Sequence, residues 1–208
     1  MTQSPPARTV HVAVFDTLAD WEIGYLAAHL RNGHFQNRSA TWEIAYVGAT
    51  DQPVTTMGGL RVVPDLTLAD LDPAESAMLV LPGGETWDSP ALAGFVEAAR
   101  RFLDSGTPVA AICGATYALA VAGLLDERTH TSNDASFLAS SGYAGADRYA
   151  GVPAVVDGDL VTASGIAPVA FARAVFERLG SHDPGVLDSW TKLYADGDPA
   201  GYFELMSA

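Results

Sequence analysis

The chain has 208 residues, of which 49% are hydrophobic and 17% charged, a composition typical of a globular protein with a full core. Lys and Arg total 11 against 25 Asp and Glu, and the resulting net charge of −14 argues against nucleic acid or an anionic membrane as a partner. One cysteine cannot form an intrachain disulfide and the polar N-terminus has no apolar signal segment, so we expect a cytoplasmic protein.

Strand-like and helix-like segments alternate along the chain after a short flexible tail, residues 1–8. In order we expect a strand at 9–15, a helix at 21–30 capped by Asp20, a strand at 42–47, a hairpin at 54–63, a connection at 64–72, a strand at 78–81, a helix from 89 or 90 to 104, a strand at 109–112, a helix at 115–124, a short helix at 134–140, a hairpin at 154–163, and helices at 168–179 and 185–194. This alternation predicts one α/β domain, residues 9–208, with a mostly parallel sheet covered on both faces.

The only cysteine stands where an apolar strand meets a helix of small residues, in Val109-Ala-Ala-Ile-Cys113-Gly-Ala-Thr-Tyr-Ala-Leu-Ala. A sharp strand-to-helix joint is the layout of a nucleophile elbow, which exposes a strained residue at the top of a sheet. The free N–H groups of the following helix favour a thiolate, so we expect the pKa of Cys113 to lie below the free value of about 8.5.

Two other interpretations of this segment stay open from the pattern alone. A lone cysteine is often a small buried hydrophobe rather than a nucleophile. Residues 107–125 carry no charge and are a candidate membrane span, although Pro108, Gly114 and Gly123 and the lack of flanking Lys or Arg argue against one.

Three features follow the ends of predicted central strands. Glu22 lies beyond the first strand, Gly83-Gly84 follow the strand at 78–81, and Cys113 follows the strand at 109–112. Ligands of parallel sheets bind beyond the carboxyl ends of the strands, so these residues are expected to converge. The alternatives are a plain turn at the two glycines and, for Glu22, a carboxylate that favours the N-terminus of its helix.

These residues resemble the ThiJ/PfpI superfamily, which includes the Parkinsonism-associated deglycase and the PfpI intracellular proteases. The matching motifs cover roughly residues 9–180 and are Asp20-Trp21-Glu22, Leu81-Pro82-Gly83-Gly84, Ala110-Ala111-Ile112-Cys113-Gly114, Ala122 to Leu125, Thr129 to Asn133 and Thr162 to Gly165. The resemblance implies a flavodoxin-like three-layer sandwich that forms a homodimer and needs no cofactor.

The resemblance also implies roles for individual residues. Cys113 is the expected nucleophile, and Glu22 is the acid whose protonated carboxyl hydrogen-bonds the sulfur. The N–H groups of Gly84 and Gly114 are expected to form an oxyanion hole. His130 falls at the position of the deglycase branch's active-site histidine.

The chain departs from several branches of the superfamily. PfpI-type proteases carry His directly after the nucleophile, where this chain has Gly114. Glutamine amidotransferases place glycines two positions on either side of the cysteine, where this chain has Ala111 and Ala115, and no His-x-Glu motif occurs. Isocyanide hydratases use Asp where this chain has Glu22. The departures argue against proteolysis and glutamine hydrolysis.

A cysteine-dependent enzyme acting on a small electrophile such as a reactive aldehyde is therefore the leading expectation. A redox-responsive protein that senses through Cys113 without turnover is the alternative, and a peptidase or amide hydrolase is a weaker one. Gly83, Thr86, Trp87 and Ser164 are expected to line the pocket. A soft-metal site of Cys113, His130 and Glu22 is chemically conceivable, but our expectation is that the protein holds no metal.

Overall fold

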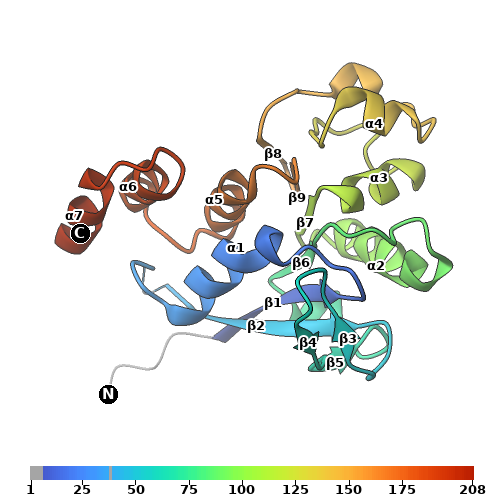
Figure 1. Ribbon diagram of the computed structural model, residues 1–208, viewed down its shortest axis with the longest axis horizontal. Helices are drawn as coiled ribbons and strands as arrows, with labels where there is room; N and C mark the ends of the chain where they lie inside the picture. The colour runs from blue at the N-terminus through green and yellow to red at the C-terminus, as the bar shows by residue number, and fades with distance from the viewer. Residues whose placement is uncertain (1–6, 38) are drawn as a thin grey trace.

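The computed structural model describes residues 7–37 and 39–208. Its centre is a seven-stranded sheet in the order β5-β2-β1-β6-β7-β9-β8, in which every neighbouring pair is parallel except the antiparallel β8 and β9 (Figure 1). The strands are β1 (Ala7–Val14), β2 (Thr41–Gly48), β5 (Leu66–Thr67), β6 (Met78–Leu81), β7 (Val109–Ile112), β8 (Ala154–Asp157) and β9 (Leu160–Ala163).

Helices cover both faces of this sheet. One layer holds α1 (Asp20–Asn32), α5 (Pro168–Leu179), α6 (Pro184–Tyr194) and α7 (Ala200–Ser207), and the other holds α2 (Ala93–Asp104), α3 (Gly114–Val121) and α4 (Ala135–Ala139) (Figure 1). The observed three-layer α/β sandwich with a mostly parallel sheet confirms the fold class predicted from the sequence.

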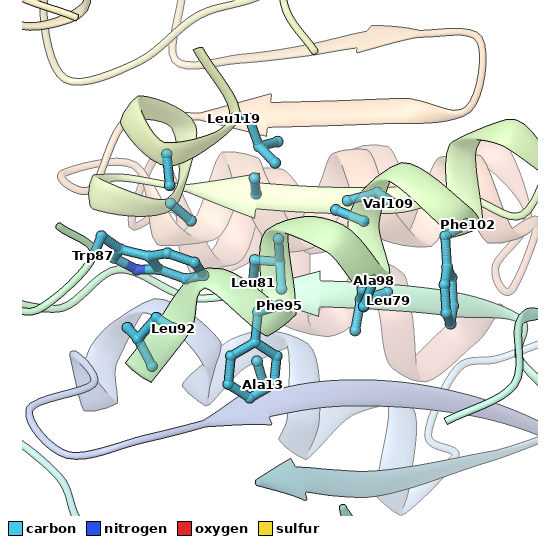
Figure 2. Packing of buried hydrophobic residues seen from close by; sticks show 14 of the residues in the cluster. Ala13, Leu79, Leu81, Trp87, Leu92, Phe95, Ala98, Phe102, Val109 and Leu119 are labelled. Atoms are coloured by element: carbon cyan, nitrogen blue, oxygen red, sulfur yellow. The ribbon is translucent and has the colours of Figure 1, made fainter. Parts of the chain in front are cut away.

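The central strands supply side chains to both layers because successive residues of a strand point to opposite faces. On β6, Leu79 and Leu81 pack with Phe95 and Phe102 of α2, as Figure 2 shows. The alternate residues Met78 and Val80 pack against the α1 and α5 side. The β6 and β7 strands are buried along their whole length, which explains their continuous apolar sequences.

The region between β2 and β6 contains the predicted hairpin and also a strand that the sequence did not predict. The predicted hairpin forms as β3 (Val54–Thr55) and β4 (Arg61–Val62), but as a separate two-stranded sheet. The predicted connection at 64–72 contains the short strand β5, which pairs with the end of β2. Two residues are too few to produce a recognisable period, so the pattern could not reveal β5.

Asp20 does not cap α1, because it is the first residue of the helix and Ala19 occupies the N-cap position. Its carboxylate instead accepts hydrogen bonds from the Thr56 hydroxyl at 2.5 Å and the Gly58 N–H at 2.7 Å. Asp20 therefore ties the β3–β4 hairpin to the start of α1. The expected cap was a local interaction, whereas the observed partner is distant in sequence.

The two ends of the chain also differ from expectation. Strand β1 begins at Ala7, so Ala7 and Arg8 of the expected tail belong to the sheet, and residues 1–6 lie outside the described residues. Beyond α6, where the sequence pattern predicts no further helix, the chain forms α7, which packs on α6 through Leu205. None of the helices within the described ranges is long and apolar enough to cross a membrane.

Candidate active site

Cys113 occupies the joint between β7 and α3 in a strained backbone conformation. Its φ of 59° and ψ of −125° fall in a region that residues with a Cβ rarely adopt. The Cys113 N–H donates to the Ala163 carbonyl at 3.1 Å, and the Thr116 hydroxyl donates to the Cys113 carbonyl at 2.5 Å. These bonds hold the predicted elbow in place and leave the thiol half-buried.

Glu22 projects from the first turn of α1 and is completely buried. Its Oε2 accepts a hydrogen bond from the Gly83 N–H at 2.5 Å, whereas Oε1 has no N–H or O–H partner in the described structure. Oε1 faces the Cys113 thiol, and burial raises the pKa of the Glu22 carboxyl. The structure thus brings Glu22 and Cys113 together as the sequence prediction required.

Two glycines leave the room that this pair needs. A Cβ on Gly83 would lie 2.6 Å from the Cys113 Cβ and 2.7 Å from Glu22 Oε2. A Cβ on Gly165 would lie 2.7 Å from the Cys113 Sγ and 3.0 Å from Glu22 Oε1. Real Cβ contacts are essentially never this short, so both positions need glycine. Gly83 was expected to line a pocket, and the structure instead places it against Glu22, which it positions.

Asn133 is a site residue that the sequence prediction did not single out. Its side-chain Nδ2 donates to the Cys113 Sγ at 3.3 Å, and its Oδ1 accepts from the Gly165 N–H at 2.8 Å. The Trp21 indole N–H donates to the Gly165 carbonyl at 3.2 Å and fixes the same glycine from the other side. The Thr129 to Asn133 motif contains the signal for Asn133, although the family resemblance points to His130 within it.

The expected low pKa of the thiol is wrong in direction. Burial raises the pKa of Cys113, and the neighbouring Glu22 carboxylate adds to that rise. The Asn133 amide and the Gly114 N–H oppose it but do not overcome it. The sequence showed the helix N-terminus behind the sulfur but not the amount of protein packed around it.

Gly84 and Gly114 lie next to each other above the elbow. A Cβ on Gly114 would lie 3.1 Å from the Gly84 carbonyl oxygen and 3.7 Å from the Gly84 nitrogen. Gly114 is the first residue of α3, so its N–H has no acceptor within the helix. The indole of Trp87 packs against Gly114, and its N–H donates to the Pro82 carbonyl at 2.9 Å. Trp87 thus supports the glycine turn.

His130 does not lie at the rim of the pocket where it was expected. It is completely buried, with Nδ1 hydrogen-bonded to the Arg128 carbonyl at 2.8 Å and Nε2 to the Tyr143 hydroxyl at 2.9 Å. Both ring nitrogens are therefore engaged away from the thiol. His130 also does not complete the conceivable soft-metal set, and the described residues contain no group of three or more His, Cys, Asp or Glu suited to a metal ion.

The remaining two expected pocket residues lie on different cavities. Ser164 lines a cavity of about 330 Å³ that also contacts Asn133. Thr86 lines a separate cavity of about 370 Å³ near the end of β1, together with Phe15 and Asp16. The two positions are therefore not parts of one pocket.

Comparison with known proteins places this geometry in a family. A DJ-1/PfpI family profile matches residues 8–178. The "Uncharacterized protease YoaZ" of Bacillus subtilis (strain 168) is 41% identical over 203 residues, covering 96% of this chain and 97% of that protein. "Deglycase PfpI" of Pyrococcus furiosus is 38% identical over 89 residues, covering 42% of this chain and 54% of that protein.

A solved structure described as a thiJ/pfpI family protein from Bacillus anthracis is similar over nearly the whole chain. Its TM-score is 0.93 at 41% sequence identity, and the match covers 99% of this chain and 98% of that one. The likeness therefore extends to the C-terminal helices α6 and α7, beyond the residues that the family profile matches.

Proposed function

The chain belongs to the DJ-1/PfpI family, and from the geometry of its site we propose that it is a cysteine-dependent enzyme that acts on small reactive aldehydes. The observation that carries the proposal is the Glu22 carboxyl, which is buried beside the Cys113 thiol with one oxygen that has no N–H or O–H partner. A buried oxygen without a partner is costly. Sharing a proton with the sulfur removes that cost.

The first step of the proposed reaction follows from this pair. As the thiol proton of Cys113 moves to the Glu22 carboxylate, the sulfur attacks the aldehyde carbon and forms a carbon–sulfur bond. The carbonyl electron pair moves to the oxygen, which the N–H groups of Gly84 and Gly114 stabilise. The alkoxide then takes the Glu22 proton, which leaves a hemithioacetal beside a carboxylate able to act as a base in later proton transfers.

A peptidase mechanism has less support, although YoaZ carries the word protease in its name. Cysteine peptidases use a histidine to activate the thiol and to protonate the leaving amine. The residue after Cys113 is Gly114, and both ring nitrogens of His130 are already hydrogen-bonded elsewhere. The aldehyde reaction needs no leaving-group acid, so the observed residues suffice for it.

The role of Glu22 is tested by the rate of thiol alkylation against pH in the parent, Glu22→Gln and Glu22→Ala. Glutamine keeps an acceptor for Gly83 and places an N–H toward the sulfur, so we expect Glu22→Gln to titrate at lower pH than Glu22→Ala by about one unit or more. The exposed Glu85→Gln removes the same charge elsewhere and should titrate like the parent. Equal titration of the Gln and Ala variants would contradict the proposed donor.

Turnover is tested by following the consumption of small aldehydes, amides and peptides by the parent and by Cys113→Ser. We expect the parent to consume aldehydes and the serine variant to be inactive, because a hydroxyl without a strong base stays protonated. If no class of compound is consumed, but peroxide oxidises Cys113 stoichiometrically to sulfenate with release of water, the redox-responsive alternative replaces the enzyme proposal.

A further inference from the structure

The cavity of about 330 Å³ beside the thiol is separate from the residues that perform the proposed chemistry. It lies between the segment 131–133, the segment 149–153 and the segment 164–167 that leads into α5. Its volume is at the lower end of the range for small-molecule sites, about 300–1,000 Å³. A cavity of this size accommodates a substituent rather than a peptide.

Two residues connect the cavity to the reacting sulfur. Asn133 lines the cavity and donates its side-chain N–H to the Cys113 Sγ at 3.3 Å. Ser164 lines it too and directly precedes Gly165, where a Cβ would lie 2.7 Å from the same sulfur. A carbonyl compound bound to Cys113 can therefore extend a substituent past Asn133 into the cavity.

Hydrogen bonds between the segments make the cavity a preformed one. The Thr131 hydroxyl donates to the Val152 carbonyl at 2.6 Å, and the Ser164 N–H donates to the Pro153 carbonyl at 3.1 Å. The Ala150 N–H donates to the His130 carbonyl at 2.8 Å. The backbone of residue 130 thus helps to hold the segment 149–153 in place.

The described residues that line the cavity carry no charge. Its walls are the ring of Tyr149 and the side chains of Val152, Pro153, Ile166 and Ala167, and its polar groups are hydroxyls and the Asn133 amide. An anionic group placed there would lose part of its water and would find no cationic side chain among the lining residues, which is costly. An apolar group would gain contacts with the walls.

We infer that this cavity is a specificity subsite that accepts an uncharged, largely apolar substituent of the carbonyl substrate and excludes an anionic one. The inference that a substrate binds here rests on the proposed function. The subsite itself is defined by the Cys113 thiol and the cavity alone. It is therefore testable with reagents that alkylate Cys113 whether or not the protein turns a substrate over.

Iodoacetamide and iodoacetate are suitable probes because they have nearly the same size and leaving group and differ in charge. In both cases the thiolate displaces iodide from carbon and forms a thioether. We expect the ratio of their rate constants at Cys113 to exceed the ratio for mercaptoethanol by about tenfold or more. Measurement in about 0.3 M salt limits the general repulsion from the acidic surface, since the Debye length there is near 6 Å.

Two valine variants separate the cavity from the overall charge. Val152 lines the cavity and is 45% exposed, whereas Val156 on β8 is 43% exposed and lies outside it. Val152→Lys should lower the iodoacetamide to iodoacetate ratio several-fold by supplying a counter-ion. Val156→Lys adds the same charge and should leave the ratio nearly unchanged. Equal ratios in the two variants would overturn the subsite.

Substrate kinetics provide a second measurement. For phenylglyoxal, an uncharged aldehyde with an apolar ring, Val152→Lys should raise KM several-fold more than Val156→Lys, with similar kcat. If no aldehyde is consumed but the alkylation ratios behave as expected, the subsite stands and the proposed enzyme activity fails. If aldehydes are consumed but the two lysine variants remain indistinguishable, the activity stands and the subsite is wrong.

Discussion

At the scale of single residues, the site depends on two glycines whose lack of a side chain leaves room for the reacting groups. Gly83 and Gly165 have no Cβ, so the buried carboxyl of Glu22 and the thiol of Cys113 can approach each other. Asn133 then ties the sulfur to the Gly165 backbone through its two side-chain atoms. The arrangement is rigid, and a change of one methyl group is expected to disturb it.

Gly83→Ala is expected to lower the rate of Cys113 alkylation at least tenfold and to destabilise the protein by about 1–3 kcal/mol, because the new Cβ overlaps Cys113 and Glu22. Gly24→Ala is the matched control. Gly24 lies exposed within α1, and a methyl group added there would meet nothing within 4 Å, so alanine should stabilise by up to about 1 kcal/mol and preserve alkylation. Urea unfolding and alkylation kinetics distinguish the two outcomes.

The elbow conformation of Cys113 is expected to cost stability. Both Cys113→Gly and Cys113→Ala remove the thiol, but glycine alone adopts a φ of 59° and ψ of −125° without strain. After allowing for the greater freedom of glycine in the unfolded chain, we expect Cys113→Gly to be more stable than Cys113→Ala by about 1 kcal/mol. Urea unfolding of the two variants measures this difference, and an alanine variant of equal or greater stability would show that the elbow is unstrained.

At the scale of elements, helix α6 is attached to α1 and α5 through an aromatic cluster. Trp190 of α6 packs edge-on against Phe176 of α5 and His29 of α1, with ring centroids 5.4 Å apart in both pairs. His182, in the loop between α5 and α6, is buried and packs against Phe176 with the rings tilted and their centroids 4.8 Å apart. Two histidines thus lie within the packing that joins three helices.

This packing predicts a loss of stability in mild acid. Burial, with a contribution from His29, lowers the pKa of His182 to about 4, below the unfolded value near 6.5. Protonation of His182 therefore favours the unfolded chain. The stability that the neutral, buried His182 contributes is complete above pH 6.5 and is lost as the pH falls toward 4. At pH 5 the cost from His182 is about 2 kcal/mol relative to pH 7.

The measurement is the change in unfolding free energy between pH 7 and pH 5 for the parent and for His182→Gln. Glutamine cannot gain a proton, so this variant should lose less stability on acidification. The exposed His34→Gln is the control and should keep the parental pH dependence. Glu22 changes the stability in the opposite direction on acidification, because its pKa is raised in the folded state and its protonation therefore favours folding. The parent and both histidine variants share this contribution, so it cancels in the comparison.

At the scale of the whole molecule, exposed apolar side chains gather beside the site. Trp21, Met57 and Leu60 line one shallow cavity, together with Gly58 and with Asp20, whose carboxylate is hydrogen-bonded to Thr56 and Gly58. Trp21 also contacts Gly165 of the site through its indole N–H. We propose this surface as the interface of the homodimer that the family resemblance implies, because a contiguous apolar patch is unfavourable in water.

Leu60→Asp is expected to convert the dimer into a monomer, because an unpaired carboxylate would become buried in the interface. Met206→Asp is the matched control, since both side chains are 62% exposed but Met206 lies on α7. Sedimentation at micromolar concentration measures the change. A monomeric parent would contradict the dimer, and dissociation by Met206→Asp alone would move the interface to α7.

Local sequence patterns were enough to predict the architecture and the position of the elbow cysteine. Continuous apolar runs identified the buried strands β6 and β7 with their observed bounds, because burial on both faces imposes that composition. The joint at Cys113 was also visible, since a strand must end and a helix begin within one residue. The expected approach of Glu22 followed from the rule that parallel strands direct their carboxyl ends to one edge.

The surroundings of those residues are a property of the folded chain. Whether the pKa of the Cys113 thiol is lowered or raised depends on how α1, the Gly83 turn and the segment around Asn133 pack around the sulfur. No local sequence pattern contains that packing. Asp20 binds a hairpin instead of capping its helix, and the ring of His130 is held by Arg128 and Tyr143 away from the sulfur. Hydrogen bonds and burial are set by neighbours in space, and most of these neighbours are remote along the chain.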